Sequence, residues 1–373
     1  MNVIFTCGGT GGHINPAIAV ANIWKARHPD SKILFICGEE ELERELITKA
    51  GYDFVPVHIK GFIRYFDWFC IKYNIKSFFT AWKAVSQCKK ILKEFKPEVI
   101  LGTGGYASFP ALMAGAQMGI PTCVHEANAV PGVTTKLAAN RANRVLVAFE
   151  ESVKYYKHPN KVQVVGMPVR KEFITTTKGE ARKELGLSGH VVVSAFGSQG
   201  AKAMNECMAE LFKLEKEAGF PFRHIHAVGS MGWEWMPQLV KEKGIDPDQD
   251  KDIQMVEYLY NMPTVMAACD VSISRAGAST CNEIAASGTP CILIPSPNVT
   301  DNHQEKNARV LEAGGGAVVV LEKECTSEAL YTLIRQLLTD ADRREEMSRK
   351  LKAMVQLDST EQICDILEEL AKN

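Results

Sequence analysis

Residues 272–304 read SISRAGASTCNEIAASGTPCILIPSPNVTDNHQ, and the rest of the chain can be interpreted from this stretch. The apolar run Cys269–Ile273 predicts a buried strand, and the small residues from Arg275 to Thr280 predict a turn that leads into a helix. A strand, a glycine turn and a helix in succession direct backbone N–H groups and the positive end of the helix dipole at one point. Such a point suits a phosphate.

Polar residues near this turn extend the predicted ligand beyond a phosphate. Ser279 and Thr280 offer hydroxyl donors, and Glu283 lies one helical turn further on, where a carboxylate would accept both hydroxyls of a ribose. After the next predicted strand, Cys291–Ile294, residues 301–304 (DNHQ) add polar groups at a strand end, where such sheets bind ligands. Together these groups predict a nucleotide-sugar site. The alternative is structural, since many strand–helix units have a small-residue turn and a helical glutamate is usually solvated.

Length and composition limit the class of protein. A chain of 373 residues predicts two domains of roughly 150–200 residues each. The net charge of −1 argues against a nucleic-acid partner. The eleven cysteines form no C-x-x-C pair, which argues against a zinc or thioredoxin-like site and fits a reducing cytoplasm. We expect no signal peptide and no spanning helix, and hence a protein that is soluble or lies on a membrane surface.

The N-terminal strand, predicted at Val3–Thr6, runs into the glycine-rich sequence GGTGGH at residues 8–13. A dinucleotide-binding loop would need a further glycine, and the next strand, Ile33–Ile36, is not followed by the acid that holds an NAD ribose. Hydride transfer is therefore disfavoured, and the Walker pattern is absent too. What remains is a loop of close approach that places Thr10 and His13 at a helix start. His13 is either a structural residue or part of the site.

A second glycine-rich turn, GTGGYAS at residues 102–108, follows a predicted strand at Glu98–Leu101. We expect it to lie beside the first turn. Residues 125–128 (HEAN) come after another strand and should line a cleft, because the ends of parallel strands meet at one edge of the sheet. Strands at 145–148 and 162–165 complete this half.

The plan then repeats in the second half. A strand at Val191–Phe196 leads into GSQGA at 197–201 and an amphipathic helix, further strands are predicted at 224–228 and 253–256, and residues 326–373 have helical periodicity. This alternation predicts the α/β class, with two Rossmann-like, doubly wound parallel-sheet domains facing across a cleft. The expected parts are an N-terminal domain at 1–166, a C-terminal domain at 167–355, and a final helix at 356–373 that packs back on the N-terminal domain.

Residues 59–96 differ from the rest, with nine Lys or Arg, two acids and ten aromatic residues. Some of the apolar residues recur at helical spacing and are expected in the core: Phe78, Ala81, Trp82, Val85 and Ile91. Others are too dense for one buried face: Phe62, Ile63, Tyr65, Phe66, Trp68 and Phe69. Basic residues interleaved with aromatic ones suit an anionic lipid surface, which is our prediction for this segment. The alternative is a cover over the sheet.

Seven motifs in sequence resemble the MurG family of glycosyltransferases: GGTGGHINPAIAVA, GTGGYASFPALMA, HEANAVPG, GMPVR, GSQGAKAMN, RAGASTCNEIAASGTP and DNHQEKNA. The resemblance covers essentially the whole chain and is weakest over residues 59–96. Phe196 stands where a second glycine is usual, and His303 where some members have glutamine. It implies the type B glycosyltransferase fold (GT-B), and a hexosyltransferase that adds N-acetylglucosamine (GlcNAc) to lipid I, undecaprenyl-pyrophosphoryl-MurNAc-pentapeptide. The product would be lipid II, a precursor in peptidoglycan synthesis.

The resemblance also implies roles for individual residues. In the second half, Ser198 would meet a phosphate of UDP-GlcNAc, the backbone near Leu259 the uracil, and Gln304 the sugar, with His303 as a possible addition. The nucleotide as a whole would lie on Ala278, Ser279, Thr280, Cys281, Asn282 and Glu283, the last of these at the ribose. The first half would contribute Thr10, Gly11, Gly12 and Asn128, and Arg170 would approach from the hinge.

The implied reaction is displacement at the anomeric carbon by the MurNAc 4-hydroxyl, with inversion. Helix N-termini and hydroxyls would stabilise the leaving UDP, with no metal or other cofactor. The candidate catalytic bases are His13, whose unperturbed pKa is near the working pH, and then Glu126, which could instead orient its loop. The expected partners are UDP-GlcNAc, lipid I, anionic lipid at the cytoplasmic face of the cell membrane and other cell-wall and division proteins. The rivals are a UDP-GlcNAc 2-epimerase of the same fold and a non-catalytic nucleotide-sugar-binding scaffold.

Overall fold

The computed structural model describes residues 1–59, 68–128, 130–299 and 302–372, with side chains left out at 68–79 and 81. Contacts divide the chain into two compact units. The first comprises Met1–Arg170 together with Gln356–Asn373, and the second comprises Lys171–Val355. Phe62, Ile63, Tyr65 and Phe66 of the predicted lipid-binding segment lie outside the described residues.

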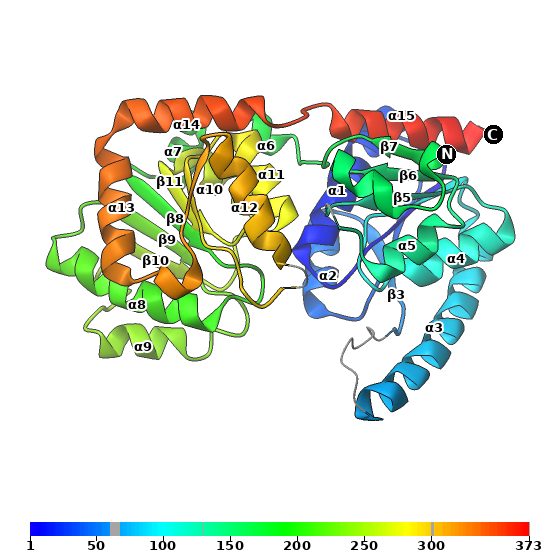
Figure 1. Cartoon of the computed structure of the whole chain (residues 1–373), viewed down its shortest axis with the longest axis horizontal. Coiled ribbons are helices and arrows are strands. Elements are labelled where there is room, and N and C mark those ends of the chain that lie inside the picture. The colour runs from blue at the N-terminus through cyan, green and yellow to red at the C-terminus, as the bar shows by residue number, and fades with distance from the viewer. Residues whose placement is uncertain (60–67, 129, 300–301, 373) are drawn as a thin grey trace. The chain divides into compact units, whose positions relative to one another are not determined.

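The first unit is built on a parallel seven-stranded sheet in the order β3-β2-β1-β4-β5-β6-β7. Figure 1 labels β3, β5, β6 and β7 of this sheet. Strand β1 lies between β2 and β4, so the direction of winding reverses at the β1–β4 pair. The strands are β1 Val3–Thr6, β2 Ile33–Cys37, β3 Asp53–Pro56, β4 Val99–Gly102, β5 Thr122–Glu126, β6 Arg144–Val147 and β7 Val162–Val164.

Helices cover this sheet, and one of them comes from the end of the chain. They are α1 Gly11–Arg27, α2 Glu41–Lys49, α3 Trp68–Phe95, α4 Ser108–Met118, α5 Val133–Ala139 and α15 Ser359–Lys372, with 3-10 helices at Glu150–Tyr155 and Pro159–Lys161. Helix α15 packs on α1, where the Cys364 thiol donates to the Val20 carbonyl at 3.6 Å. Arg27 pairs with Asp365 at 2.5 Å at the edge of this contact. The final helix therefore belongs to the first unit.

The core face of α3 differs from the prediction at Trp82. Ala84, Cys88 and Leu92 are buried in the core of the first unit, with Val85 and Ile91 packed beside them. The Trp82 side chain is instead 67% exposed, so its assignment to the core is wrong. The reason is helical geometry: two residues before Ala84 correspond to about 200° of rotation, which turns Trp82 toward the opposite face of the helix.

The second unit repeats the design with a parallel six-stranded sheet in the order β10-β9-β8-β11-β12-β13. The winding reverses here at β8 and β11, which are hydrogen-bonded neighbours. The strands are β8 Val191–Ala195, β9 Arg223–Ala227, β10 Ile253–Val256, β11 Val271–Ser274, β12 Cys291–Leu293 and β13 Ala317–Val319.

Both faces of the second sheet are covered, as strand β8 shows. Val192 packs into a core with α8 and α13, whereas Val191 and Val193 pack into another with α7 and α10. Alternation of this kind is what a strand buried on both faces requires. The helices are α6 Glu172–Thr175, α7 Lys178–Leu185, α8 Lys202–Glu217, α9 Met236–Glu242, α10 Met262–Ala268, α11 Ala278–Ser287, α12 His303–Ala313, α13 Ser327–Thr339 and α14 Ala341–Ala353, with a 3-10 helix at Glu322–Glu324.

Two parallel α/β sheets confirm the predicted fold class. Several strand ends differ by one or two residues from the prediction; for example, β11 begins at Val271, two residues after the predicted start at Cys269. Two short strands, β3 and β13, were not predicted. Over the described residues, the helices are all too short or too polar to cross a bilayer.

Candidate functional site

The two glycine-rich loops of the first unit meet where the winding of its sheet reverses. Loop 8–13 follows β1 and loop 103–108 follows β4, and these strands are direct neighbours. Contact between the loops is so close that a Cβ on Gly105 would lie 2.0 Å from the carbonyl oxygen of Gly8. Glycine is therefore required at this position, and the predicted adjacency of the loops is confirmed. A crevice at such a reversal point is the usual ligand site of doubly wound sheets.

Helix α1 starts from the first of these loops. Thr10 is its N-cap residue, is exposed, and makes no capping hydrogen bond through its side chain. The first turn, which includes Gly11 and Gly12, contains no acidic side chain. No acidic side chain of its own first turn therefore offsets the positive dipole end, which favours an anion.

His13 is fixed by Thr103, a residue of the second glycine loop that the sequence-based set missed. The His13 Nδ1 lies 3.3 Å from the Thr103 carbonyl oxygen, and the Thr103 hydroxyl donates to the His13 carbonyl at 2.7 Å. Because a carbonyl oxygen only accepts, the neutral ring carries its proton on Nδ1, which leaves Nε2 as the acceptor. Burial lowers the pKa of His13, although the charge of Glu126 opposes that shift. The ring thus has the protonation state of a general base.

The Glu126 carboxylate organises the loop that follows β5. It is buried and accepts hydrogen bonds from the Asn128 backbone at 3.0 Å, the Asn128 side chain at 2.9 Å and the Gly132 backbone at 3.2 Å. Three N–H donors on one carboxylate are typical of a structural anchor. This arrangement supports the interpretation that Glu126 orients Asn128, and it favours His13 as the proton acceptor.

The second unit brings its own pair of loops together at the corresponding place. The GSQGA loop follows β8, and its Ser198 carbonyl accepts from the Ser230 backbone at 3.1 Å. A Cβ on Gly200 would lie 2.1 Å from the Val228 carbonyl oxygen, so the chain after β9 packs directly on this loop. The turn after the neighbouring strand, β11, contains Arg275, whose guanidinium lies 5.9 Å from the centre of the Phe196 ring.

Helix α11 begins in the turn after β11. Gly277 is its N-cap residue and provides no side-chain cap, and the first turn has no acidic residue. Ser279 and Thr280 are half-buried in that first turn, and Glu283 is half-buried one turn further along. Cys281, by contrast, is 5% exposed and points into the protein, so only its backbone is available to a ligand. The sequence-predicted phosphate turn is thus a helix N-terminus without a compensating acid.

Gln304 connects the two strand-end loops of this site. Its side-chain carbonyl accepts from the Ser296 backbone at 2.9 Å and from the Ala276 backbone at 3.3 Å. With its oxygen fixed on the backbone, the amide presents its N–H donors. Arg275, in the same turn, donates to the Ile294 carbonyl at 3.0 Å and pairs with Glu322. The residues that shape the predicted donor site are therefore held by hydrogen bonds within the second unit.

Two further predicted site residues, Leu259 and Arg170, lie outside these loops. Leu259 is 7% exposed and belongs to a core cluster, so its side chain is not available and only its backbone can meet a base. Arg170 is half-buried and is the last residue of the first unit's main segment.

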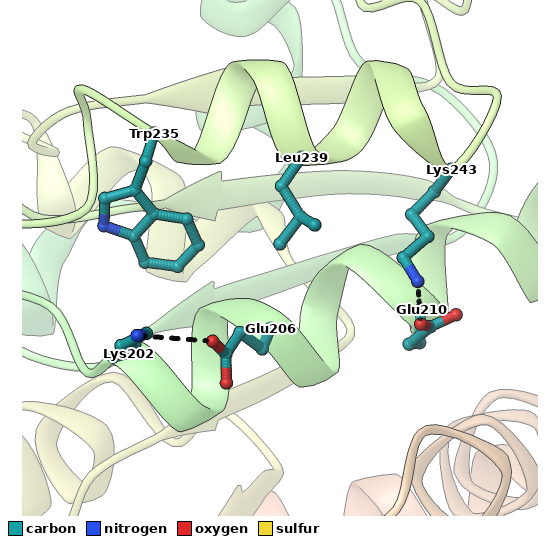
Figure 2. A pocket seen from close by; sticks show the side chains of 6 residues that line it. All are labelled: Lys202, Glu206, Glu210, Trp235, Leu239 and Lys243. Atoms are coloured by element: carbon teal, nitrogen blue, oxygen red, sulfur yellow. Dashed lines mark ion pairs between the residues drawn. The ribbon is translucent and has the colours of Figure 1, made fainter.

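A groove of about 520 Å³ lies elsewhere in the second unit, between α8 and α9 (Figure 2). Trp235 and Leu239 form its apolar wall, and its charged residues are neutralised in pairs, Lys202 with Glu206 at 3.9 Å and Lys243 with Glu210. None of the predicted substrate-binding residues lines it. The groove therefore does not define the candidate site.

Comparisons with known proteins identify the class and the family of the chain. Residues 3–147 match the glycosyltransferase family 28 N-terminal domain, and residues 191–363 match the glycosyltransferase family 28 C-terminal domain. Among solved structures, the chain is similar to MurG of Acinetobacter baumannii, with a TM-score of 0.68, 24% identity and coverage of 99% and 100% of the two chains. It is also similar to a UDP-GlcNAc 2-epimerase of Neisseria meningitidis, with a TM-score of 0.65, 16% identity and coverage of 99% and 100%. At these identities the structures show the fold alone. The two domain matches define the class as a two-domain glycosyltransferase of family 28.

Sequence relatives are more specific. The chain is 41% identical to a protein of Caldanaerobacter subterraneus subsp. tengcongensis, over 98% of this chain and 99% of the relative, and 38% identical to one of Acetivibrio thermocellus, over 100% and 99%. Both relatives are named UDP-N-acetylglucosamine--N-acetylmuramyl-(pentapeptide) pyrophosphoryl-undecaprenol N-acetylglucosamine transferase. The chain belongs to this family of transferases.

Proposed function

We propose that this protein is the inverting transferase that moves GlcNAc from UDP-GlcNAc to the MurNAc 4-hydroxyl of lipid I, and thereby forms lipid II for peptidoglycan synthesis. The observation that carries the proposal is full-length identity of 41% to a relative named for this transfer. The geometry is consistent with it, because each unit presents a helix N-terminus with no acid in its first turn at the reversal point of its sheet.

The donor nucleotide is assigned to the second unit. The α11 N-terminus and the hydroxyls of Ser279 and Thr280 would hold the diphosphate, with Ser198 contributing from the GSQGA loop. Glu283 would accept hydrogen bonds from the ribose hydroxyls, and the backbone at Leu259 would contact the uracil base. The Gln304 amide would donate hydrogen bonds to the sugar hydroxyls. Ala278, Cys281 and Asn282 would contribute through the same helical turns. Negative charge that builds on the leaving phosphate is stabilised by such fixed dipoles.

The first unit supplies the catalytic base and further contacts to the sugar diphosphate. His13 would take the proton of the attacking hydroxyl on Nε2, since Nδ1 faces the Thr103 carbonyl. Thr10, Gly11 and Gly12 would contact the diphosphate or sugar, and the Asn128 side chain would join them from the loop that Glu126 anchors. Arg170 would approach from the end of this unit. Glu126 is the second candidate for the base.

The acceptor is carried by a lipid, which leads to a proposal about location. We place the protein at the cytoplasmic face of the cell membrane as a peripheral protein, with anionic lipid as its surface and other cell-wall and division proteins as further partners. The support is the basic and aromatic composition of residues 59–96, together with Trp82, which is exposed on α3. Each basic residue near such a surface contributes about 1 kcal/mol.

The direct test is incubation with labelled UDP-GlcNAc, with and without a short-chain lipid I analogue. We expect label in the lipid product and release of UDP only when the acceptor is present. The formation of UDP-ManNAc without acceptor would instead identify a 2-epimerase. Binding of UDP-GlcNAc without any turnover would identify a nucleotide-sugar-binding scaffold.

A further inference from the structure

Helix α2 carries one carboxylate that does not face solvent. Glu43 is fully buried, at 0% exposure, whereas Glu41 of the same helix has a side chain that is 73% exposed. The Glu43 Oε1 accepts a hydrogen bond from the backbone N–H of Gly9, in the first glycine-rich loop. A carboxylate from a neighbouring helix thus reaches beneath the loop that begins α1.

The glycines of this region leave room for the carboxylate. A Cβ on Gly8 would lie 3.0 Å from the Glu43 Oε1, and a Cβ on Gly38 would lie 2.8 Å from its Oε2. A side chain at Gly38 would therefore displace the carboxyl group. One at Gly8 would press on the carboxyl group and, more closely, on the Ala107 Cβ at 2.6 Å. The contact fixes the Gly8–Gly9 turn, and the residues that follow this turn are Thr10 to His13.

The burial of the Glu43 carboxyl group lowers the stability of the fold. Burial raises the pKa of its carboxyl group, and the hydrogen bonds from Gly9 and Gly38 oppose that shift only in part. The groups nearest to it are Glu40 and the buried thiols Cys7 and Cys37, and burial raises the pKa of Cys37 to about 12. None of these groups is cationic. The hydrogen bond with the Cys37 thiol also lowers the pKa of Glu43, but burial and the charge of Glu40 outweigh it. A buried acid without a cationic neighbour among these groups costs stability, and such arrangements concentrate at functional sites.

We infer that Glu43 is a positioning residue for GlcNAc transfer. Its carboxylate anchors the backbone of Gly9, and through it the start of α1 and the His13 ring. The inference rests on the proposed function, because the role of Thr10 to His13 in the reaction is part of that proposal. Glu43 itself contacts the loop rather than the substrate.

Alanine and glutamine variants at residue 43, with Glu41→Ala as the matched control on the exposed face of α2, test the inference. In Glu43→Ala the anchor is lost, and we expect kcat to fall about 100-fold, the size of effect that a small misplacement of reacting groups produces. Glu43→Gln keeps an acceptor oxygen, so its kcat should be at least about tenfold higher than that of Glu43→Ala. Glu41→Ala should match the wild type in kcat and KM. Equal kcat in Glu43→Ala and Glu41→Ala would overturn the inference.

A second readout reports on the contact itself. Amide hydrogen exchange at Gly9 should be at least about tenfold faster in Glu43→Ala than in the control, because its N–H has lost its acceptor. If Glu43→Ala does not fold, Glu43→Asp, whose carboxylate is one methylene shorter, replaces it in both measurements. Unchanged exchange and unchanged kcat in the folded variant would contradict the inference. Absence of transfer in the wild type would instead refute the proposed function, so the two failures can be told apart.

Discussion

His13 and Thr103 hold each other through two hydrogen bonds that run in opposite directions. The Thr103 hydroxyl donates to the His13 carbonyl at 2.7 Å, and the His13 Nδ1 faces the Thr103 carbonyl at 3.3 Å. The first bond fixes the backbone at the start of α1, and the second fixes the ring and its tautomer. Each residue comes from a different glycine-rich loop, so the reversal of winding at β1 and β4 is what joins them.

Replacement of His13 by alanine should lower kcat by roughly 10²–10⁴, the usual contribution of a general base. Because burial lowers the pKa of His13, the acid limb of kcat/KM against pH should lie below pH 6.5 in the wild type and disappear in the variant. The exposed His158 provides the control, as His158→Ala should keep both the rate and the limb. Near-normal turnover of His13→Ala across this pH range would transfer the role to Glu126 or water.

Gly104 should be required for the orientation of His13. Its φ is +109°, and a Cβ there would lie 2.6 Å from the His13 Nδ1. Gly119 has a comparable φ of +74° but open space around its Cβ position. Both Gly104→Ala and Gly119→Ala should therefore lose some stability through backbone strain. Only Gly104→Ala should lower kcat, by at least about tenfold, in steady-state assays below the Tm of both variants. A similar kcat for the two would show that the ring tolerates displacement.

Removal of the Glu283 carboxylate should weaken donor binding. A hydrogen bond to a charged group contributes about 1.5–3 kcal/mol, so Glu283→Ala should raise the KM for UDP-GlcNAc by roughly ten- to a hundredfold. Glu345, which is exposed on α14, provides the control substitution in the same unit. An unchanged KM and kcat in Glu283→Ala would remove this residue from the site.

A buried histidine should make the stability of the protein depend on pH. Ser194 bonds to His224 at 2.8 Å and to His226 at 2.7 Å, and the ring of Phe212 packs edge-on against His226. Burial first, and then the charge of His224, lowers the pKa of His226 to about 3. In the unfolded chain the pKa of His226 is near 6.5. Between about pH 3 and pH 6.5, the unfolded state therefore binds a proton at His226 that the folded state does not bind.

The free energy of unfolding should consequently fall as the pH decreases from about 6.5 toward 3, with a contribution from His226 of at most about 1.4 kcal/mol per pH unit. His226→Phe should flatten this slope in urea titrations at pH 5 to 7.5, whereas His158→Phe at the surface should not. Glu215, which bonds to His224 at 2.8 Å and whose pKa is raised by burial, contributes with the opposite sign, so the difference between wild type and variant is the quantity to compare. Parallel slopes would show that His226 binds protons equally in the folded and unfolded states.

Trp82 provides the structural test of lipid contact. It is 67% exposed on α3, so Trp82→Ser should reduce co-sedimentation with anionic phospholipid vesicles without loss of stability. Substitution of Phe66 and Trp68 by serine should act in the same direction. Met231 is 72% exposed in the second unit, and Met231→Ser should leave vesicle binding unchanged. If all variants bind equally, the membrane surface is not recognised by this segment.

The sequence predicted the parallel sheets and the glycine loops because these depend on local patterns. A buried strand followed by glycines and a helix can be recognised without knowledge of the rest of the fold, and the loops after β1 and β4, as well as those after β8 and β11, were found in this way. Their adjacency follows from the topology of a doubly wound sheet.

Contacts between distant residues were not predictable by the same means. Glu43 belongs to a run of charged residues, ELERELITK, and its burial depends on the glycine loop that lies above it in the fold. Thr103 was part of a recognised motif, but its pairing with His13 depends on the order of the strands. The assignment of Trp82 to the core was wrong for a different reason. Several apolar residues share helix α3, and their periodicity did not decide which face of the helix is buried.

A crystal structure after soaking with UDP-GlcNAc tests the central claim most directly. We predict density for the uridine in the second unit, with the diphosphate at the N-terminus of α11 and the ribose at Glu283. Uridine bound to the first unit, or no ligand density near residues 278–283 at saturating UDP-GlcNAc, would contradict the account.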